Sequence, residues 1–356
     1  MKVVHLLPAL EQGGVETVVC DLVTGMRNKG REMGDGWESV VISSGGRLVK
    51  KIETAGGRHI ALDLKSKNPL TYFFRAWKLR HVLRVEKPDL VCAHSRVPAW
   101  LFVWANCGLG IKWITYAHGA NSVSRYSKVM TQGDLVITPS RFLADYLKAS
   151  YGTSESKIRV IPNSVDAKRF DPENVDQTFI AGKRREWGIR EGDRVLMAIG
   201  RITPVKGLDG LIREFATGKL DASKLVIVGG ADKHHRQYFE SLKTLASSLI
   251  PVSRSSSSSP IVFAGPQEKV PECIAIADEV VSANTTKPET FGLSVVEAYA
   301  MNKPVRAKRF GGVAEVMEAV EKAKRPTLRE AVLSLYDLSI QAERTLAAYH
   351  EALDMV

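Results

Sequence analysis

Residues 195–208 read VLMAIGRITPVKGL, and this stretch decides the fold. Its five apolar residues, 195–199, predict a buried strand, and the helical periodicity that follows predicts a helix after a short loop. Gly200 and Arg201 come directly after the strand, and Lys206 lies near the end of the loop. A parallel sheet binds ligands at the carboxyl ends of its strands, where Arg201 can fork onto two phosphate oxygens and Lys206 can add a point charge. The alternative is a pair of solvated basic residues.

The same alternation of short apolar runs and amphipathic helical stretches extends over most of the chain, which predicts an α/β fold with parallel sheets. The expected strands are 3–7, 39–43, 59–62, 90–94, 113–116, 135–138, 158–161, 195–199, 224–228, 261–264, 279–282 and 305–307. The expected helices include 15–26, 73–85, 141–148, 208–215, 237–247, 271–277 and 293–300.

The pattern is interrupted once, so we expect two Rossmann-like domains. Residues 1–165 form the first domain, and 166–190, where Pro172, Asn174 and several charges interrupt the pattern, form the linker. Residues 191–326 form the second domain. Residues 327–356 are helical and contain no strand, and we expect them to return to the first domain. Ser253 to Ser259 is a serine-rich run that predicts a solvated loop without chemistry of its own.

Composition limits the class of protein. With 356 residues, 44% hydrophobic and 25% charged, the chain is typical of a soluble globular protein. The formal net charge of +11 calls for a polyanionic partner: nucleic acid, anionic lipid or a phosphorylated glycan. No nucleic-acid-binding signature supports the first of these. No apolar run approaches a membrane span, so we expect a cytoplasmic protein whose membrane contact, if any, is peripheral.

The four cysteines, Cys20, Cys92, Cys107 and Cys273, show no CxxC spacing. Structural zinc is therefore not expected, and reduced, buried thiols are the default interpretation.

Gly13-Gly14 follows the first expected strand and opens the first expected helix. Glycine lets a backbone approach a ligand closely, and a helix N-terminus offers N–H groups to an anion. A tight turn without a ligand is an equal alternative. The GxGxxG spacing is missing, which argues against a nicotinamide dinucleotide.

Residues 288–298, PETFGLSVVEA, place two acids around a helix start. Glu289 lies in the loop before the helix, and Glu297 comes about one turn inside it. The helix dipole favours phosphate at its N-terminus, and a carboxylate can accept hydrogen bonds from both hydroxyls of a ribose. An acidic cap and an exposed helix residue remain the plain alternatives.

Taken together, these motifs resemble the retaining glycosyltransferases of the GT-B fold, specifically family 4, which includes many bacterial lipopolysaccharide enzymes. The Glu-x7-Glu pattern stands at Glu289 and Glu297, and the Gly-Arg…Lys-Gly pattern at 200–201 and 206–207. Further likenesses are Gly13-Gly14, 160–166, 228–230, 304–305 and 311–315, so that the resemblance covers roughly residues 1–316 in family order.

The resemblance implies an N-terminal acceptor-side domain and a C-terminal donor domain that face each other across a cleft. It implies a metal-independent, hexosyltransferase-like enzyme that moves a sugar from a nucleotide diphosphate sugar to a glycan or lipid-linked acceptor, in lipopolysaccharide core or surface polysaccharide assembly. No cofactor is implied. The catalytic residues would be His118, Glu289, Arg201 and Lys206, and the donor-binding residues Gly13, Gly14, Gly200, Phe291, Gly292, Leu293, Ser294 and Glu297.

The sequence departs from the family pattern after Val316, where a glycine-rich loop and a further strand are missing. Arg306 and Lys308 also replace small or neutral residues. A catalytically silent GT-B-like binding protein and a sugar-nucleotide epimerase therefore remain alternatives.

A second basic region concerns the acceptor or the membrane. Residues 72–84, YFFRAWKLRHVLR, predict a basic helix with aromatic residues, which suits anionic lipid at the inner face of the cytoplasmic membrane. The alternative is an ordinary crossover helix with a solvated basic face. The residues concerned are Arg75, Trp77, Lys78, Arg80 and Arg84, together with Arg125 and Lys128 of a later basic patch.

Overall fold

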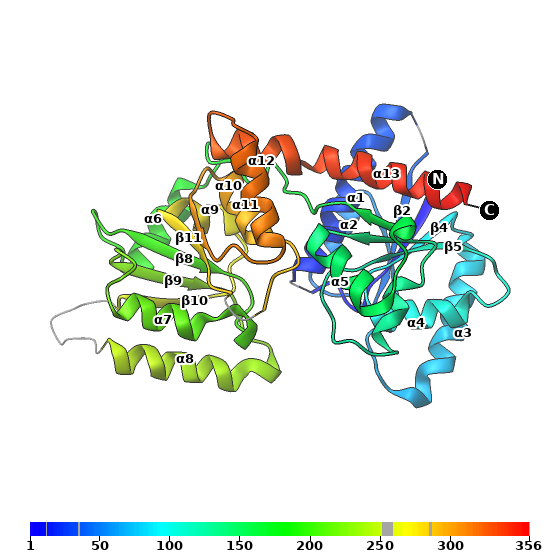
Figure 1. The fold of residues 1–356 in the computed structure, drawn as a ribbon, viewed down its shortest axis with the longest axis horizontal. Coiled ribbons are helices and arrows are strands. Elements are labelled where there is room, and N and C mark those ends of the chain that lie inside the picture. The colour runs from blue at the N-terminus through cyan, green and yellow to red at the C-terminus, as the bar shows by residue number, and fades with distance from the viewer. Residues whose placement is uncertain (12, 35, 251–258, 285–286, 356) are drawn as a thin grey trace. The chain divides into compact units, whose positions relative to one another are not determined.

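The computed structural model of the protein describes residues 1–11, 13–34, 36–250, 259–284 and 287–355. The chain divides into two compact units (Figure 1). Unit 1 comprises Met1–Ser164 and Tyr336–Val356, and unit 2 comprises Val165–Leu335. Each unit has one parallel sheet with helices packed on it, so the predicted α/β class is confirmed.

Unit 1 has a seven-stranded sheet in the order β3-β2-β1-β4-β5-β6-β7. The strands are β1 (Lys2–Leu6), β2 (Glu38–Ser43), β3 (Arg58–Ala61), β4 (Leu90–Ala93), β5 (Lys112–Tyr116), β6 (Leu135–Thr138) and β7 (Ile158–Val160). The helices are α1 (Gly14–Met33), α2 (Val49–Thr54), α3 (Tyr72–Glu86), α4 (Arg96–Ala105), α5 (Arg141–Tyr151) and α13 (Leu338–Asp354). The strand order reverses between β1 and β4, and such a switch point is where open α/β sheets bind ligands.

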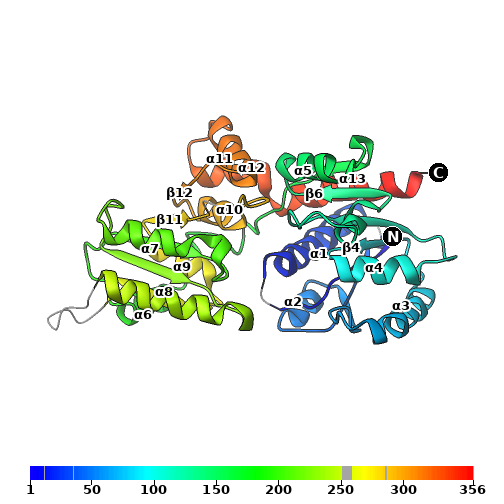
Figure 2. The ribbon, with the colours of Figure 1, turned by 60° about the horizontal axis from the view of Figure 1, so that its bottom comes forward.

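Both faces of the central strands of the unit 1 sheet are buried, which is why β1, β2, β4 and β6 read as nearly continuous apolar runs, whereas the edge strand β3 is partly exposed. Val3 belongs to the core formed with α1 and α13, whereas its neighbour Val4 belongs to the core formed with α3 and α4. Helices α3 and α4 lie side by side (Figure 2).

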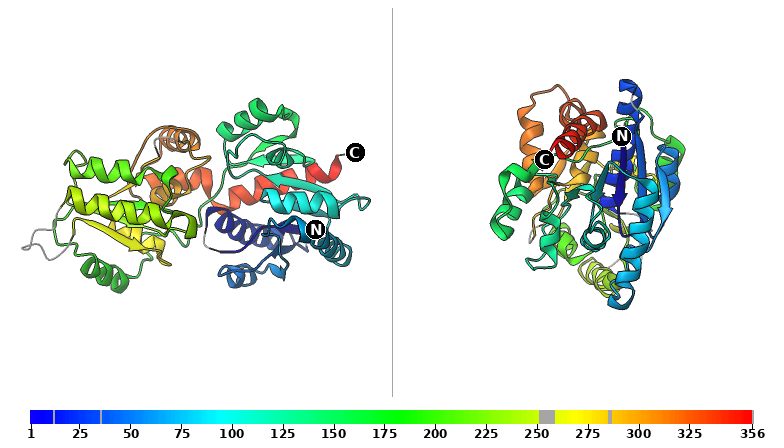
Figure 3. Two further views of the ribbon diagram at one scale, coloured as in Figure 1. Left: turned by 90° about the horizontal axis from the view of Figure 1, so that it is seen from below. Right: turned by 90° about the vertical axis from the view of Figure 1, so that its right-hand side faces the viewer.

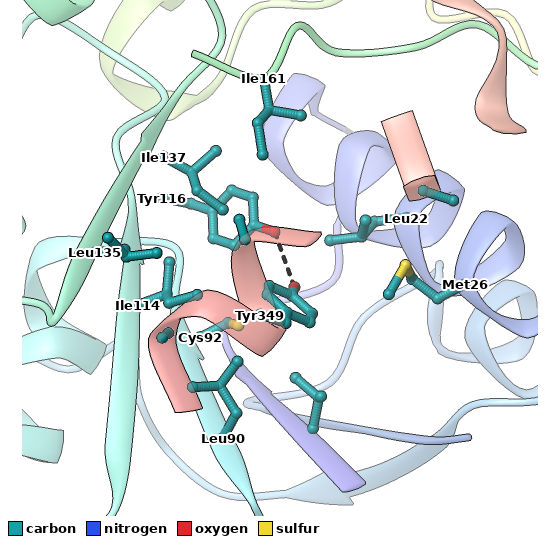
Figure 4. Packing of buried hydrophobic residues seen from close by; sticks show 14 residues of the cluster. Leu22, Met26, Leu90, Cys92, Ile114, Tyr116, Leu135, Ile137, Ile161 and Tyr349 are labelled. Atoms are coloured by element: carbon teal, nitrogen blue, oxygen red, sulfur yellow. Dashed lines mark hydrogen bonds between the residues drawn. The ribbon is translucent and has the colours of Figure 1, made fainter. Parts of the chain in front are cut away.

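The C-terminal helix α13 completes unit 1 by packing along α1 (Figure 1). Its Tyr349 is fully buried among residues of α1, β4, β5 and β6 (Figure 4). The hydroxyl groups of Tyr116 and Tyr349 are 2.8 Å apart and form a hydrogen bond. This buried polar contact joins the last helix to β5 near the centre of the sheet.

Unit 2 has a five-stranded sheet in the order β10-β9-β8-β11-β12. The strands are β8 (Val195–Ile199), β9 (Lys224–Val228), β10 (Ile261–Gly265), β11 (Glu279–Ser282) and β12 (Val305–Ala307). The helices are α6 (Gln177–Glu186), α7 (Leu208–Ala216), α8 (Arg236–Leu249), α9 (Val270–Ile276), α10 (Leu293–Ala300), α11 (Gly312–Lys322) and α12 (Leu328–Tyr336). Helices α7 and α8 lie side by side (Figure 3) and share a core with the sheet.

The expected linker, 166–190, differs from the structure. It belongs to unit 2 and contains α6, which packs on α9. The polar residues that interrupt the sequence pattern begin this helix: the Asp176 carboxylate accepts a hydrogen bond from the backbone N–H of Phe179 at 3.0 Å. Asp at an N-cap starts a helix. The boundary between the units lies between Ser164 and Val165, where the interruption begins, and residues 166–190 fold as part of unit 2 and not as a separate linker.

Three further helices, α2, α4 and α11, were not among those expected. Helix α4 is apolar on most sides, with Leu101, Phe102 and Ala105 buried, so it lacks the periodicity of a surface helix. Its Pro98 lies in the first turn, where proline is tolerated. Helix α11 runs through Val316, and β12 is the last strand of the described sheet on that side.

Three of the four cysteines, Cys20, Cys92 and Cys273, are free and buried, as expected, but Cys107 is exposed because it lies beyond the end of α4. In the described part of the chain, every helix is too short or too polar to cross a bilayer. Most of the serine-rich run, residues 253–258, lies outside the described residues.

Candidate functional site

The carboxyl edge of the unit 2 sheet presents Gly200 and Arg201. The Gly200 N–H donates to the Val228 carbonyl at 3.0 Å, which joins the ends of β8 and β9. A Cβ atom on Gly229 would lie 1.8 Å from the Gly200 carbonyl oxygen, so only glycine at 229 lets the two strand ends approach. Arg201 follows as an exposed side chain, and within the described chain it has no carboxylate within 4.0 Å. Its charge is therefore available to a ligand.

Lys206 ends a short 3-10 turn (Pro204–Lys206) and reaches back to Glu289. The Lys206 Nζ atom lies 2.5 Å from the Glu289 Oε1 atom, and the two side chains are 28% and 16% exposed. Sequence analysis assigned both residues to one site, and the structure does bring them together. They meet as an ion pair, however, so an arriving phosphate would share Lys206 with Glu289.

The loop that carries Glu289 is fixed by the start of α11. The Gly312 N–H donates to the Glu289 carbonyl at 2.8 Å. A Cβ atom on Gly312 would lie 2.3 Å from the carbonyl oxygen of Thr290, so a larger residue would push the loop away. The glycines at 311–312 thus hold Glu289 in place by close backbone approach.

The N-terminus of α10 lies next in the chain. Gly292 caps it with φ 101° and supplies no side chain to satisfy the first N–H groups. The first turn of any helix leaves such groups without a helical partner, and the helix dipole favours an anion there. Ser294, in this first turn, lines a cavity together with Gly200, Arg201 and Lys206.

That cavity has a volume of about 20 Å³. This is room for roughly one water molecule, so a nucleotide sugar would lie across its mouth and not inside it. Four of the predicted residues therefore line one cavity, and Glu289 joins them through Lys206. The remaining predicted residues of this region do not line it: Phe291 is 4% exposed and buried, and Gly292, Leu293 and the partly buried Glu297 lie elsewhere on the loop and helix.

Sequence reasoning missed Asn284, which also lines this cavity. It is 6% exposed, and its Oδ1 atom has no hydrogen-bond partner among the described residues. A buried amide oxygen without a partner is costly, so Asn284 is suited to receive a ligand hydroxyl or N–H group. Its position in the sequence could have indicated it, because Asn284 comes shortly after the end of β11 just as Arg201 comes shortly after the end of β8.

In unit 1, His118 follows β5 and belongs to a row of three imidazoles. The His118 Nε2 and His94 Nδ1 atoms are 3.0 Å apart, and the His94 Nε2 and His5 Nδ1 atoms are 3.1 Å apart. Burial lowers the pKa of His5 and of His118 to about 4. Burial, followed by the charges of the other two imidazoles, holds the pKa of His94 well below its usual range. All three rings are therefore neutral at pH 7.

Neutral imidazoles constrain one another, because each has a single N–H group to donate. Since His94 uses both of its nitrogens within the row, the tautomer of His118 is linked to the tautomer of His5. His118 was predicted from the sequence, whereas His5 and His94 were not. They lie in β1 and directly after β4, the strands at the switch point of the sheet.

Gly13 and Gly14 lie at the same edge, after β1. Gly13 caps α1 in an extended conformation, with φ −169°. A Cβ atom on Gly14 would have no described atom within 4 Å, so packing inside unit 1 does not require glycine there.

The expected basic surface of α3 needs correction. Arg75 is only 4% exposed and donates to the carbonyls of Asp63 and Asn68, and Arg80 donates to the carbonyls of Ala105 and Cys107. Both guanidinium groups serve the packing of unit 1, because Arg75 shares the buried stripe of the helix and Arg80 reaches the end of α4. The other residues of the set are exposed: Trp77, Lys78, Arg84, Arg125 and Lys128.

Comparison with known proteins agrees with this architecture. Residues 12–169 match the family model described as Glycosyltransferase Family 4, and residues 180–324 match Glycosyl transferases group 1. The D-inositol 3-phosphate glycosyltransferase of Mycobacteroides abscessus is 30% identical over 188 residues, which are 52% of this chain and 39% of that protein. The match thus spans about two fifths of that relative's length.

Two solved structures share the fold. A glycosyltransferase from Rickettsia africae has a TM-score of 0.81 and 24% identity, covering 100% of this chain and 99% of that chain. Anabaena HepE, crystallised with UDP-glucose, also has a TM-score of 0.81, with 18% identity, 99% of this chain and 100% of its own. Because both halves match in family order and the whole chain shares the fold, the chain belongs to the family 4 glycosyltransferases, which are enzymes of the GT-B fold.

Proposed function

We propose that the chain is a retaining glycosyltransferase whose unit 2 holds a nucleoside diphosphate sugar at the carboxyl edge of its sheet. The observation that carries the proposal is the cluster of Arg201, the Lys206–Glu289 ion pair and Ser294 at the α10 N-terminus. Arg201, the Lys206 ammonium paired with Glu289, and the N-terminus of α10 lie next to one cavity, and all three can bind the oxygens of a diphosphate.

In this proposal the residues stabilise the leaving group. Arg201 binds the diphosphate through two parallel hydrogen bonds, and the first N–H groups of α10 face the same oxygens. Charge builds on the diphosphate as the glycosidic bond breaks, and fixed donors stabilise that charge most in the transition state. Glu289 accepts hydrogen bonds from sugar hydroxyls, and Glu297 accepts them from the ribose. The acceptor hydroxyl attacks from the face that the diphosphate leaves and passes its proton to the departing diphosphate, so the sugar keeps its anomeric configuration.

His118 in unit 1 is proposed to hydrogen-bond the transferred sugar. Because its pKa lies at about 4, the ring acts as a neutral group at pH 7 and not as a cation. Its Nε2 atom is engaged by His94, so contact with a substrate would be made through Nδ1. Gly13 and Gly14 are proposed to leave room for the donor.

The proposed donor rests on a structural relative, and the proposed acceptor rests on the family and on the charge of the chain. The UDP-glucose bound by HepE makes UDP-sugars the first donors to test. The proposed acceptor is a glycan or glycolipid of lipopolysaccharide core or surface polysaccharide, and the charge of +11 suits a phosphorylated acceptor or an anionic membrane surface. We also propose that the reaction needs no bound metal, because cations and helix N–H groups neutralise the diphosphate. A chelator should then leave the rate unchanged, and loss of activity that Mg²⁺ restores would contradict this.

Donor hydrolysis in the absence of acceptor tests the enzyme assignment. Nucleotide release from UDP-glucose and other nucleotide sugars is compared among wild type, Arg201→Ala, Glu289→Ala and the control Arg213→Ala, an exposed arginine on α7. Loss of a fixed charge donor should slow release roughly hundredfold in Arg201→Ala, whereas Arg213→Ala should match wild type. Equal rates in all four proteins would favour a silent binding protein. An altered sugar on intact nucleotide would favour an epimerase.

A further inference from the structure

Unit 1 contains a cavity of about 520 Å³ at the start of α3 and along α4, beside the loops that follow β3 and β5. We call it the aromatic pocket, because four rings line it: Tyr72, Trp100, Trp104 and Tyr126. Its size is that of pockets that bind small ligands. The Trp100 indole N–H donates to the Tyr126 carbonyl at 2.9 Å, and the two rings are stacked with centroids 6.5 Å apart. This wall of the pocket is therefore preformed.

Three cations, Lys67, Arg75 and Arg96, also line the aromatic pocket, and no carboxylate does. Within the described residues, none of the three has an acidic side chain within 4.0 Å, in contrast to Lys206 of unit 2. Arg96 is oriented by neutral groups: its Nη1 atom donates to the Ser127 hydroxyl at 3.1 Å, and its guanidinium lies 5.4 Å from the centre of the Tyr126 ring. Positive charge held in place by neutral partners attracts an anion.

The positive charge of the buried Arg75 is held in a fixed position by hydrogen bonds within unit 1. It donates to the Thr71 hydroxyl at 3.2 Å and to two backbone carbonyls. The Asp63 carboxylate acts on Arg75 through its charge, but no described carboxylate lies within 4.0 Å of the guanidinium group, so an anionic ligand in direct contact would stabilise this buried cation further.

A further polar group in the pocket has no partner. The Tyr72 hydroxyl is buried and has no hydrogen-bond partner among the described residues. Burial raises the pKa of Tyr72 to about 12, so the group is a neutral hydroxyl at pH 7. Buried hydroxyl groups are nearly always paired, so this residue of the pocket lining keeps an unused hydrogen-bonding capacity.

We propose that the aromatic pocket binds a phosphorylated hexose unit of the acceptor. The aromatic rings would contact the apolar face of the pyranose, Arg75 and Arg96 would bind the phosphate, and the Tyr72 hydroxyl would pair with a ligand oxygen. The acceptor role rests on the proposed function, but the binding chemistry does not. A purely apolar ligand would make no ionic contact with the cations, and a simple anion would make no contact with the aromatic rings.

Exposed apolar side chains near the pocket help to decide whether the ligand is free or carried on a lipid. Leu70 is 90% and Phe73 63% exposed, and the Phe73 ring meets the 51% exposed Trp104 edge-on with centroids 5.1 Å apart. Exposed apolar groups beside an anion-binding pocket suit a headgroup that is carried on a lipid, but the same pocket would take a free sugar phosphate.

Binding of glucose 6-phosphate, glucose and inorganic phosphate, followed by calorimetry, tests the proposal. Glucose 6-phosphate should bind saturably and at least about tenfold more tightly than either fragment, because each fragment lacks one set of contacts. Trp104→Ala should weaken its binding roughly tenfold. The matched control is Trp77→Ala, which removes an exposed tryptophan of α3 that does not line the pocket. Absence of saturable binding, or equal loss in both variants, would overturn the proposal.

Tyr72→Phe separates a ligand-binding role from a structural one. Removing an unpaired buried hydroxyl should leave the Tm of the unliganded protein unchanged or higher, and it should weaken glucose 6-phosphate binding about fivefold to tenfold. A lowered Tm with unchanged binding would show that the hydroxyl serves the fold and would contradict the assignment.

Two further arms identify the source of the ligand and keep this proposal separate from the donor site. Phosphatidylcholine vesicles with and without a phosphorylated hexose glycolipid distinguish a lipid-borne headgroup from the free sugar phosphate. Glucose 6-phosphate binding by Arg201→Ala should match that of wild type, because Arg201 does not line the aromatic pocket. If glucose 6-phosphate fails to bind while Arg201→Ala still slows nucleotide release as predicted, the pocket proposal fails and the proposed function stands.

Discussion

At the scale of single residues, the row His5–His94–His118 links the core of unit 1 to the edge where a sugar is proposed to bind. His5 is fully buried, and its Nε2 atom has no hydrogen-bond partner among the described residues. An orphaned N–H group is rarer in proteins than an orphaned acceptor. We therefore infer that His5 donates through Nδ1 to His94 and that His94 donates in turn to His118, which leaves the His118 N–H on Nδ1. The ¹⁵N chemical shifts of the three imidazoles report which ring nitrogen carries the hydrogen. A hydrogen on Nε2 of His5 would contradict the inferred direction of donation.

The lowered pKa values of these histidines make stability depend on pH. The folded-state pKa of His5 is about 4 against 6.5 for the free side chain, so below pH 6.5 the unfolded chain binds a proton that the folded chain refuses. The free energy of unfolding should therefore be constant above about pH 7 and fall between pH 6.5 and 4, by up to about 1.4 kcal/mol per pH unit for each buried imidazole. Urea denaturation between pH 7.5 and 5 measures the slope.

The variant His5→Asn sharpens this prediction, because its amide can replace Nδ1 toward His94 but does not titrate. Its slope below pH 6.5 should be shallower than that of wild type. The control His350→Asn changes an exposed histidine of α13 and should keep the wild-type slope. Identical slopes in all three proteins would show that His5 is not part of the pH response.

Residues differ in how well the sequence identifies them. Arg201 and Lys206 could be predicted because a strand, a glycine and two cations follow one another within the printed stretch. Asn284 and His94 could not, because a single polar residue after a buried strand carries no spacing signal. Arg75 was misjudged because a helix pattern does not show which basic residue neighbouring loops will enclose.

At the scale of elements, α13 depends on the Tyr116–Tyr349 contact (Figure 4). Tyr349→Phe keeps the volume but leaves the Tyr116 hydroxyl without this partner in an apolar core. The free energy of unfolding should fall by about 1–3 kcal/mol, the cost of one buried polar group left unpaired. The double variant Tyr116→Phe/Tyr349→Phe removes both hydroxyl groups and should be more stable than the sum of the single changes predicts. Additive losses in urea denaturation would contradict this coupling.

Elements were predictable where the chain is buried on both sides. All twelve expected strands are present, because strands of a parallel sheet read as short apolar runs. Helices were harder. Helix α6 begins with the polar residues expected of a linker, and α4 is too apolar to show a period.

At the scale of the whole molecule, the charge of +11 and the exposed Phe74 and Trp77 lead us to propose peripheral attachment to anionic lipid. Lys78 and Arg84 are exposed on the same helix, and each basic residue near such a surface contributes about 1 kcal/mol. Co-sedimentation with phosphatidylglycerol-containing vesicles should decrease as salt is added, and Trp77→Ala should reduce it. Equal binding to neutral phosphatidylcholine vesicles would exclude an electrostatic origin.

Fold and family could be inferred from the sequence because the glycine, cation and acid motifs keep their order over most of the chain. The return of the chain to unit 1 through α13 depends on long-range packing, which local periodicity shows only as an amphipathic helix. The identities of donor and acceptor depend on pocket shape, and no motif in the sequence encodes that shape.

The most direct measurement is the binding of nucleotide sugars to wild type, Arg201→Gln and Arg213→Gln by isothermal titration calorimetry. One nucleoside diphosphate sugar should bind to wild type and Arg213→Gln alike. Arg201→Gln should bind it at least about tenfold more weakly, because it loses a charge-assisted contact to the diphosphate. Equal affinity in all three proteins, or no binding by any member of a panel of uridine, guanosine and adenosine diphosphate sugars, would contradict the donor site in unit 2.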